Sequence, residues 1–166
     1  MADEKMMSLI LSTWIGDIEI TGTERGVSGI YFPVTTKKKP ESSNAGLIPE
    51  SVEIAVRELT EYFEGMRKIF SVPLDPAGTC FQHSVWDELL KVPYGQTASY
   101  GEIAKRIGKP GASRAVGGAN RRNPVSIIIP CHRILGSDGS LTGYGGPHGI
   151  EYKRRLLEFE KTNNRT

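Results

Sequence analysis

A cysteine followed directly by a histidine is the pair of side chains in this sequence best suited to chemistry. Cys131 and His132 stand in the motif Pro130-Cys131-His132-Arg133, after the apolar run 125–129. A thiol is a nucleophile only as the thiolate, and the ordinary pKa of cysteine, about 8.5, leaves a few per cent ionised at neutral pH. His132 is therefore the candidate base, although a buried and unreactive cysteine is the alternative.

The backbone around this pair determines whether the two side chains can meet. We predict that residues 125–129 form a strand, which would hold Cys131 on a stiff backbone. Neighbouring side chains on an extended backbone point to opposite faces. A turn or a bridging water is then needed to connect the thiol to the imidazole.

The first half of the chain predicts a small sheet with one helix. Strands are expected at residues 8–11, 14–20 and 29–32, with a further return strand at 69–74. The polar segment 35–46 is expected to be a mobile loop. Apolar residues three to four positions apart predict a helix that Gly65 ends, and they are Val52, Val56, Leu59 and Phe63.

The second half predicts three helices before the cysteine motif and one further helix after it. Thr79 with Gln82 and Ser99 with Glu102 have the spacing of two capping boxes, each of which starts a helix. A third short helix is expected over residues 113–120. It would form a helix-turn-helix with the helix that starts at Ser99. The linker 73–78 separates a domain at 1–75 from a domain at 79–166. The predicted class is α+β, with a sheet-and-helix domain before a mostly helical, winged-helix-like one.

The third helix combines positive charge with small side chains. Two adjacent glycines, Gly117 and Gly118, each cost a helix interior about 1 kcal/mol relative to alanine. Close approach of a neighbouring helix or strand would explain them, and so would close approach of a DNA groove. The net charge is only +2, but a basic cluster surrounds the helix, formed by Lys105, Arg106, Lys109, Arg114, Arg121 and Arg122. This cluster is either a solvated face or a surface that contacts phosphates.

These motifs together resemble the O6-alkylguanine-DNA alkyltransferase family, also called methylated-DNA–protein-cysteine methyltransferases. The resemblance covers roughly residues 79–160. Its matches follow the order of the family's motifs, namely Phe81-Gln82, Val85-Trp86, Pro93-Tyr94-Gly95, Ser99-Tyr100, residues 114–118 and residues 130–133. The resemblance implies a repair protein that moves the alkyl group of O6-alkylguanine irreversibly to its own cysteine. O4-alkylthymine is a second candidate substrate, and no cofactor is implied.

The resemblance also implies roles for individual residues near the cysteine. Cys131 would accept the alkyl group, a water would join it to His132, and Glu160 would orient the histidine. Tyr100 would supply a proton to the departing guanine oxygen, and Asn123 would act as a hinge beneath the cysteine segment. The residues alone leave two interpretations of Glu160. It lies either at the buried edge of an apolar helix face, where it would need a partner, or at a frayed helix end near Lys161. The apolar face is formed by Tyr152, Leu156 and Phe159.

Further residues are implied to contact DNA or to line the pocket for the base. Arg114 would fill the space left by a nucleotide flipped out of the duplex, at a cost of a few kcal/mol for the flipping. The other implied DNA contacts, in the minor groove, are Ser99, Ala115, Gly117, Gly118 and Arg121. The implied pocket residues are Asn120, Ile134, Tyr144 and Gly145. The expected partner is double-stranded DNA carrying the damaged base.

The composition of the chain limits the classes of function that remain. We expect no structural metal, because the histidines and Cys80 are scattered along the chain. No apolar stretch is long enough to span a membrane and no secretory signal is evident, so we expect a cytoplasmic monomer, nuclear in a eukaryote. Three alternatives stay open. They are a non-catalytic alkyltransferase-like damage-binding module, a cysteine hydrolase and a transcription regulator.

Overall fold

The computed structural model describes residues 6–32, 46–142 and 148–165. The chain divides into two compact units, Met1–Ala77 and Gly78–Thr166, and each is described by itself. Most of the predicted loop 35–46 lies outside the described residues, as do the predicted pocket residues Tyr144 and Gly145.

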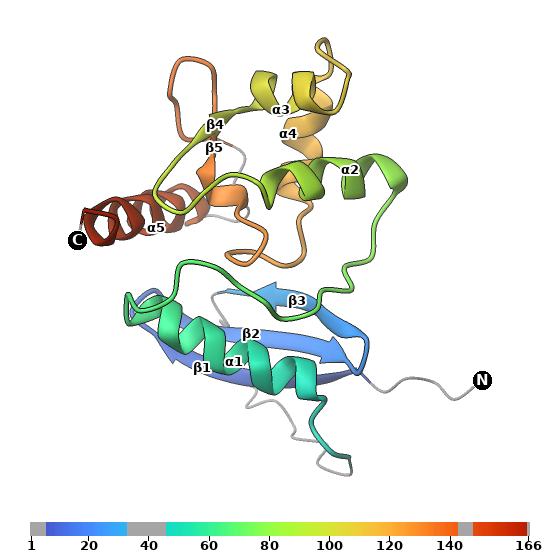
Figure 1. Cartoon of the computed structure of the whole chain (residues 1–166), viewed down its shortest axis with the longest axis vertical. Coiled ribbons are helices and arrows are strands. Elements are labelled where there is room, and N and C mark those ends of the chain that lie inside the picture. Colours follow the sequence, from blue (N-terminus) through green and yellow to red (C-terminus); the bar gives the residue numbers. More distant parts are fainter. Residues whose placement is uncertain (1–5, 33–45, 143–147, 166) are drawn as a thin grey trace. The chain divides into compact units, whose positions relative to one another are not determined.

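The first unit is a three-stranded antiparallel sheet packed against one helix (Figure 1). Its strands are β1 (Met7–Thr13), β2 (Gly16–Thr23) and β3 (Gly26–Tyr31), joined in that order, and its helix is α1 (Glu50–Phe63). Helix α1 contacts all three strands. Ile18 and Ile20 of β2 are fully buried, as are Val52 and Leu59 of α1. The predicted class and the predicted helix are therefore confirmed.

Two details of the predicted sheet are wrong. Trp14 and Ile15 form the turn between β1 and β2 instead of beginning a strand. The predicted strand at residues 69–74 does not form, and Leu74 alone makes a bridge, with Val27. The reason lies in Glu58, whose carboxylate accepts hydrogen bonds from the amides of Ser71 and Val72 at 3.0 and 3.2 Å. Those amides are consequently not available to a neighbouring strand.

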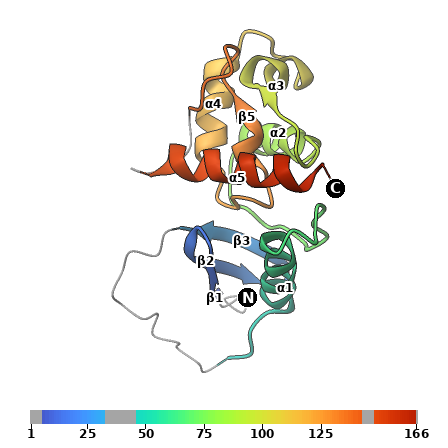
Figure 2. The same ribbon diagram turned by 90° about the vertical axis from the view of Figure 1, so that its left-hand side faces the viewer.

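The second unit is mostly helical. Its elements are α2 (Cys80–Leu89), β4 (Ala98–Ser99), α3 (Tyr100–Arg106), α4 (Ser113–Arg121), the 3₁₀ turn η1 (Cys131–Arg133), β5 (Ile134–Leu135) and α5 (Gly149–Asn163). Helices α2, α3 and α4 pack against one another (Figure 2). Strands β4 and β5 form a short parallel pair, and α5 contacts η1. The cysteine motif thus lies where the helix-turn-helix and the last helix meet.

Local hydrogen bonds fix where the helices of this unit begin. In α2, Gln82 donates its amide to the Thr79 hydroxyl and accepts the Thr79 amide on its own side chain. In α3, Ser99 and Glu102 make the same reciprocal pair. Both predicted capping boxes are confirmed. Helix α4 begins at Ser113 as expected, but no side chain caps it.

Candidate active site

The run Val125–Ile129 is a turn, and the prediction that it forms a strand is wrong. Ile127 has a φ of +74°, in the left-handed region that costs a β-branched residue about 1–2 kcal/mol. Asn123 holds the turn, because its Oδ1 accepts the amide of Val125 at 3.0 Å and its Nδ2 donates to the carbonyl of Ile129 at 2.8 Å. The Ile127 side chain is fully buried. Packing and the Asn123 hydrogen bonds together offset the strain.

The cysteine itself lies in the 3₁₀ turn η1, not on extended backbone as predicted. Cys131 is 3% exposed, and its thiol lies 4.0 Å from the Ser126 hydroxyl, to which it can donate a weak hydrogen bond. Asn120, at the end of α4, donates its side-chain amide to the Cys131 carbonyl at 3.3 Å. The backbone on both sides of the sulfur is therefore held by asparagines, Asn120 and Asn123.

His132 and Glu160 form a hydrogen-bonded pair in the interior. Nε2 of His132 lies 2.6 Å from Oε1 of Glu160, and both side chains are fully buried. Arg133 donates from Nε to Oε2 and from Nη2 to Oε1 of the same carboxylate, each at 2.9 Å. The amide of Gly95 donates to Oε2 at 3.2 Å. The carboxylate thus accepts from η1 and from the segment that follows α2.

Burial and charge together set the protonation of this cluster. Burial lowers the pKa of His132, and the charge of Glu160 opposes this effect. Burial alone would raise the pKa of Glu160, but His132 and Arg133 outweigh it and hold that pKa well below its usual range. Burial raises the pKa of the Cys131 thiol in spite of hydrogen bonds from Asn123 and Ser126. The resting site holds a neutral thiol, a neutral imidazole and a carboxylate.

The tautomer of the histidine follows from its partner. A carboxylate only accepts hydrogen bonds, so Nε2 of neutral His132 carries the proton and Nδ1 carries the lone pair. Nδ1 has no hydrogen-bond partner within the part of the chain that the structure describes. A basic nitrogen without a partner among the described residues can accept a proton, and because the Cys131 sulfur makes its hydrogen bond to Ser126, that proton would have to reach Nδ1 through a bridging water.

A buried lysine completes the site, and the sequence pattern did not predict it. Lys153 of α5 is fully buried, and its ammonium donates to the carbonyls of Ile134 and Thr142, the latter at 2.8 Å. Tyr100 donates its hydroxyl to the same Thr142 carbonyl at 2.7 Å, and Lys153 Nζ lies 3.5 Å from that hydroxyl. Burial lowers the pKa of Lys153 to about 8 and raises that of Tyr100. Tyr100 therefore stays protonated.

The buried face of α5 is more polar than predicted. It consists of Gly149, Lys153, Leu156 and Glu160. Tyr152 and Phe159, which the sequence assigned to an apolar face with Leu156, are only half-buried. Lys153, Leu156 and Glu160 are three and four residues apart, which places them on one face of a helix. That spacing could have indicated that Lys153 is buried together with Leu156 and Glu160. Glu160 lies within the helix and not at a frayed end, since α5 continues to Asn163.

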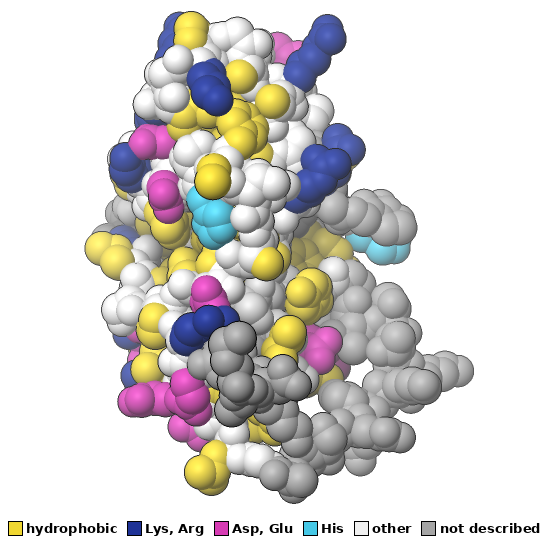
Figure 3. All heavy atoms as spheres, turned by 90° about the vertical axis from the view of Figure 1, so that its right-hand side faces the viewer, with side chains coloured by type: hydrophobic (Ala, Val, Ile, Leu, Met, Phe, Trp, Pro, Cys, Tyr) yellow, Lys and Arg dark blue, Asp and Glu magenta, His cyan; other side chains and the backbone are white. Residues whose placement is uncertain are grey.

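The residues predicted to contact DNA lie mostly on the outside of α4. Arg114, Ala115 and Arg121 are exposed, whereas Ile134 of the predicted pocket is fully buried. Ser99 caps α3 with its hydroxyl. Lys and Arg side chains stand out on the surface over this unit in Figure 3.

The two glycines of α4 are not required by the packing of the described atoms. A Cβ built at Gly117 would meet only the Tyr100 ring, at 3.9 Å, which is an ordinary contact. A Cβ built at Gly118 would meet only the end of the Arg122 side chain, at 3.3 Å. No described helix or strand approaches closely enough to exclude a methyl group at either position. The first of the two explanations for these glycines is therefore not supported.

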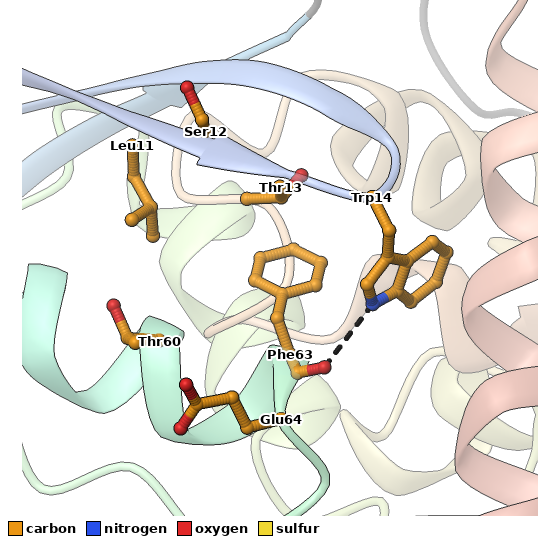
Figure 4. Close-up of a pocket in the computed structure, with 7 residues that line it drawn as sticks. All are labelled: Leu11, Ser12, Thr13, Trp14, Thr60, Phe63 and Glu64. Carbon is orange, nitrogen blue, oxygen red and sulfur yellow. Dashed lines mark hydrogen bonds between the residues drawn. The ribbon is translucent and has the colours of Figure 1, made fainter.

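The first unit contains a pocket of different character. It has a volume of about 310 Å³ and lies between the β1–β2 turn and the end of α1 (Figure 4). Trp14 and Phe63 meet edge to face there, and Trp14 Nε1 donates to the Phe63 carbonyl at 3.3 Å. Its walls include no cysteine, histidine or lysine. The candidate chemistry therefore belongs to the second unit.

Residues 6–32, 46–142 and 148–165 contain neither a cluster of metal-ligating side chains nor a membrane-spanning helix. No three His, Cys, Asp or Glu side chains in these ranges converge as a metal site would require. No helix in them has both the length and the apolar character needed to cross a bilayer.

Comparison with known proteins agrees with this geometry. Residues 6–76 match the ribonuclease-like domain of 6-O-methylguanine DNA methyltransferase, and residues 80–162 match its DNA binding domain. The methylated-DNA–protein-cysteine methyltransferase of Methanosarcina acetivorans is 47% identical over 156 residues, which are 93% of this chain and 98% of that protein. The one from Mycobacterium bovis is 57% identical over 132 residues, which are 80% of this chain and 74% of that protein.

Solved structures match as well. The O6-methylguanine methyltransferase of Mycobacterium tuberculosis has a TM-score of 0.83 at 42% identity, over 96% of this chain and 94% of that one. The structure of Mycobacterium tuberculosis OGT in complex with DNA has a TM-score of 0.77 at 43% identity, over 95% of this chain and 93% of that one. With both units matched and nearly half of the residues identical, this chain belongs to the 6-O-methylguanine DNA methyltransferase family.

Proposed function

We propose that this protein repairs DNA by transferring the alkyl group of O6-alkylguanine to the sulfur of Cys131. The observation that carries the proposal is a buried cysteine followed in sequence by a histidine whose Nε2 is fixed by Glu160 and whose Nδ1 has no hydrogen-bond partner among the described residues. The S–C bond that forms is a stable thioether, so each molecule reacts once. O4-alkylthymine is a second candidate substrate, because it also carries an O-alkyl group on a base.

The bonds and protons of this transfer balance without a cofactor. The thiol proton moves to Nδ1 of His132, through a bridging water as in the family that the sequence resembles. The resulting imidazolium is stabilised by the Glu160 carboxylate. The thiolate attacks the alkyl carbon, and the bond from that carbon to O6 breaks with its electrons going to the guanine. The guanine then takes a proton from Tyr100, and solvent carries the proton held by the His132 imidazolium back to Tyr100.

Tyr100 is the proposed donor to the departing O6. Its pKa is raised by burial, so the phenol is protonated and can donate. In the free protein this hydroxyl donates to the carbonyl of Thr142 at 2.7 Å, and during transfer it would turn to O6. Lys153 also donates to that carbonyl and so offers it a second partner when Tyr100 leaves.

For binding, we propose that α4 enters the minor groove of duplex DNA. The glycines Gly117 and Gly118 support this, because among the described residues only side chains, those of Tyr100 and Arg122, would contact a Cβ there, and no described helix or strand explains them. Exposed Arg114 would take the space of the flipped nucleotide, and the neighbouring basic cluster would contact phosphates. Phosphate contacts make affinity fall steeply with salt and depend little on sequence. One chain supplies every residue used, so the proposed form is a monomer, in the cytoplasm or in the nucleus of a eukaryote.

The primary test compares the two cysteines. Duplex DNA carrying radiolabelled O6-methylguanine is mixed with the parent, with Cys131→Ser and with Cys80→Ser. Cys131→Ser should accept no label yet bind DNA nearly as well as the parent, because serine is far harder to ionise. Cys80 is exposed and free, so Cys80→Ser should label fully. Label on Cys131→Ser at the parent's rate would refute the assignment.

A second test concerns the glycines of α4. Gly117→Ala should leave the melting temperature unchanged or raise it, because alanine favours a helix by about 1 kcal/mol and fits the available space. Repair of duplex DNA should nevertheless slow, while reaction with free O6-benzylguanine should not. Arg114→Ala should give the same split between duplex and free base. Equal rates on duplex DNA for Gly117→Ala and the parent would contradict the docking of α4 in a groove.

The same labelling separates the alternatives. A non-catalytic damage-binding module would bind alkylated DNA without taking up label, and Cys131 argues against it because such modules lack the acceptor cysteine. A cysteine hydrolase would turn over many times. A transcription regulator would prefer one undamaged sequence.

A further inference from the structure

Arg133, the last residue of the cysteine motif, makes more contacts with the catalytic cluster than sequence reasoning assigned to it. Its side chain is 5% exposed. Two of its nitrogens meet both oxygens of Glu160, each at 2.9 Å, which is the bidentate geometry of a strong arginine–carboxylate pair. A third, Nη1, donates to the carbonyl of Val92 at 2.7 Å.

These contacts fix the carboxylate in space. Oε1 of Glu160 accepts from both His132 Nε2 and Arg133 Nη2, and Oε2 accepts from Arg133 Nε and the Gly95 amide. These donors engage both oxygens of the carboxylate, two on each. The Arg133 guanidinium is planar and makes three hydrogen bonds, two to Glu160 and one to the Val92 carbonyl. These bonds restrict the orientation in which the Glu160 carboxylate meets His132.

Arg133 also changes the charge that His132 experiences. A histidine beside a lone buried carboxylate becomes a stronger base, because the carboxylate favours the imidazolium. Here the carboxylate is paired with a buried cation, so the pair is close to neutral. In agreement, burial, Arg133 and Lys153 lower the pKa of His132 while Glu160 raises it, and the net direction is downward.

We propose that Arg133 is a positioning residue of the alkyl transfer, which fixes the orientation of Glu160 and, by neutralising its charge, limits the basicity of His132. The inference rests on the proposed function, since it concerns the base of that reaction. Its consequence is a neutral His132, ready to accept a proton through Nδ1, over the whole range around neutral pH.

The charged and titratable groups near His132 belong to three parts of the second unit, which are α5, the segment after α2 and η1. From α5 these are Glu160 and Lys153, and from the segment after α2 the group is Tyr94, whose ring lies 5.7 Å from the Arg133 guanidinium carbon. From η1 itself they are Cys131 and Arg133. Lys153 also lowers the pKa of His132, so it remains as a constant background when Arg133 is replaced.

The first experiment uses the parent protein and requires no alkyl transfer. Nitrogen-15 NMR of the imidazole of His132 reports its tautomer and its titration. The expected result at pH 7.5 is a neutral ring protonated on Nε2. A ring protonated on Nδ1, or an imidazolium, would overturn the proposal even if every variant failed to fold.

The second experiment replaces Arg133 and follows the pH dependence of the reaction with free O6-benzylguanine. Arg133→Met removes the charge at similar length, and Arg133→Lys keeps the charge without the two-pronged contact. Arg154→Met is the matched control, because Arg154 lies on the surface of α5 and pairs with exposed Glu151. Melting curves establish the temperature at which every variant is folded.

Arg133→Met should move the acid limb of the rate profile, and the titration of His132, up by about one pH unit, because one nearby charge is lost. Arg133→Lys should keep the limb in place but slow the reaction several-fold, and Arg154→Met should change neither. An unmoved titration in Arg133→Met, or an equal shift in Arg133→Lys, would overturn the inference. A parent that takes up neither the benzyl group nor the label of O6-methylguanine in duplex DNA would instead refute the proposed function, and the NMR titrations would still test Arg133.

Discussion

Each of the two units buries a glutamate, and the partners of the two carboxylates differ. Glu58 of α1 is 1% exposed and accepts mainly neutral donors, which are the hydroxyl and amide of Ser71 and the amide of Val72. Among the described residues, the cation that pairs with it is Arg67, at 3.4 Å and with 27% of its side chain exposed. Glu160 of α5 is fully buried and meets His132 and the buried Arg133.

The comparison separates a structural carboxylate from a functional one. Burial alone would raise the pKa of Glu58, but hydrogen bonds from Ser71 and Val72 outweigh it and lower that pKa. Those donors belong to the returning chain, so the contacts of Glu58 hold backbone in place. The partners of Glu160 are an imidazole and a cation, so the same chemical group can control the state of a base. Partners, and not burial, distinguish the two roles.

The largest effect is expected for Glu160→Gln. The substitution leaves the Arg133 charge buried without a counter-ion, which costs about 3–5 kcal/mol of unfolding free energy. It should also slow reaction with O6-benzylguanine by at least about 100-fold, because the imidazolium loses its carboxylate. Urea unfolding and single-turnover rates measure the two effects. A variant that reacts like the parent would abolish the distinction between the two glutamates.

Glu58→Gln should be destabilising without being inactive. An amide has one acceptor oxygen in place of two, so some donors of Ser71 and Val72 lose their partner, at about 1–3 kcal/mol. The transfer rate of folded molecules should equal that of the parent, because nothing near Cys131 changes. The same two measurements apply. A slower transfer step at full folding would show that the first unit influences the chemistry.

The two units should also differ in acid. The folded-state pKa of His132 lies below its ordinary 6.5, so the associated stability is present above pH 6.5 and is lost as the pH falls below it. Glu58 and Glu160, with pKa values lowered from 4.5, begin to lose stability only below pH 4.5.

Between pH 6.5 and 4.5 we therefore expect the free energy of unfolding to fall for the second unit and not for the first. For the one proton on His132 the fall is at most about 1.4 kcal/mol per pH unit. Amide hydrogen exchange in α1 and α5, corrected for the intrinsic pH dependence, follows each unit. Equal loss of protection in both helices over this range would count against the assigned state of His132.

The smallest effect is expected for Arg67→Met. Arg67 pairs with Glu58 and with Glu61, and solvent reaches part of its side chain. Partly exposed ion pairs contribute about 0–1 kcal/mol, so the melting temperature should fall only slightly. Transfer should be unchanged, in contrast to Arg133→Met. A loss as large as that of Glu160→Gln would mean that the Glu58 site, too, depends on its cation.

The sequence predicted what short-range patterns control. Thr79 with Gln82 and Ser99 with Glu102 start helices through bonds three residues apart, so their spacing suffices, and both boxes are confirmed. The roles given to Tyr100, Glu160 and the DNA-contacting residues stay predictions, although the contact of Glu160 with His132 makes its proposed role feasible. Tyr144 and Gly145 lie outside the described residues.

Long-range partners explain what the sequence did not predict. A lysine is normally predicted to lie on the surface. Lys153 is buried because the fold places the carbonyls of Ile134 and Thr142 within hydrogen-bonding distance of its ammonium. The returning segment at residues 69–74 has strand-like composition, but Glu58 takes its amides. The apolar run 125–129 likewise has the composition of a strand, and Asn123 bends it instead. In the last two cases a single polar side chain overrides the local preference, Glu58 from a distance in the sequence and Asn123 from nearby.

Ile127 imposes a constraint on how this segment forms and varies. Glycine there would relieve the left-handed backbone but leave a void where a fully buried side chain packed, which costs several kcal/mol. Asparagine would tolerate the backbone but bring a polar group into an apolar interior. Isoleucine adopts this conformation only when the surrounding core is assembled. We therefore expect the cysteine loop to reach its folded shape late in folding, so that a newly made, incompletely folded chain has an accessible thiol but not yet the site that places it for alkyl transfer.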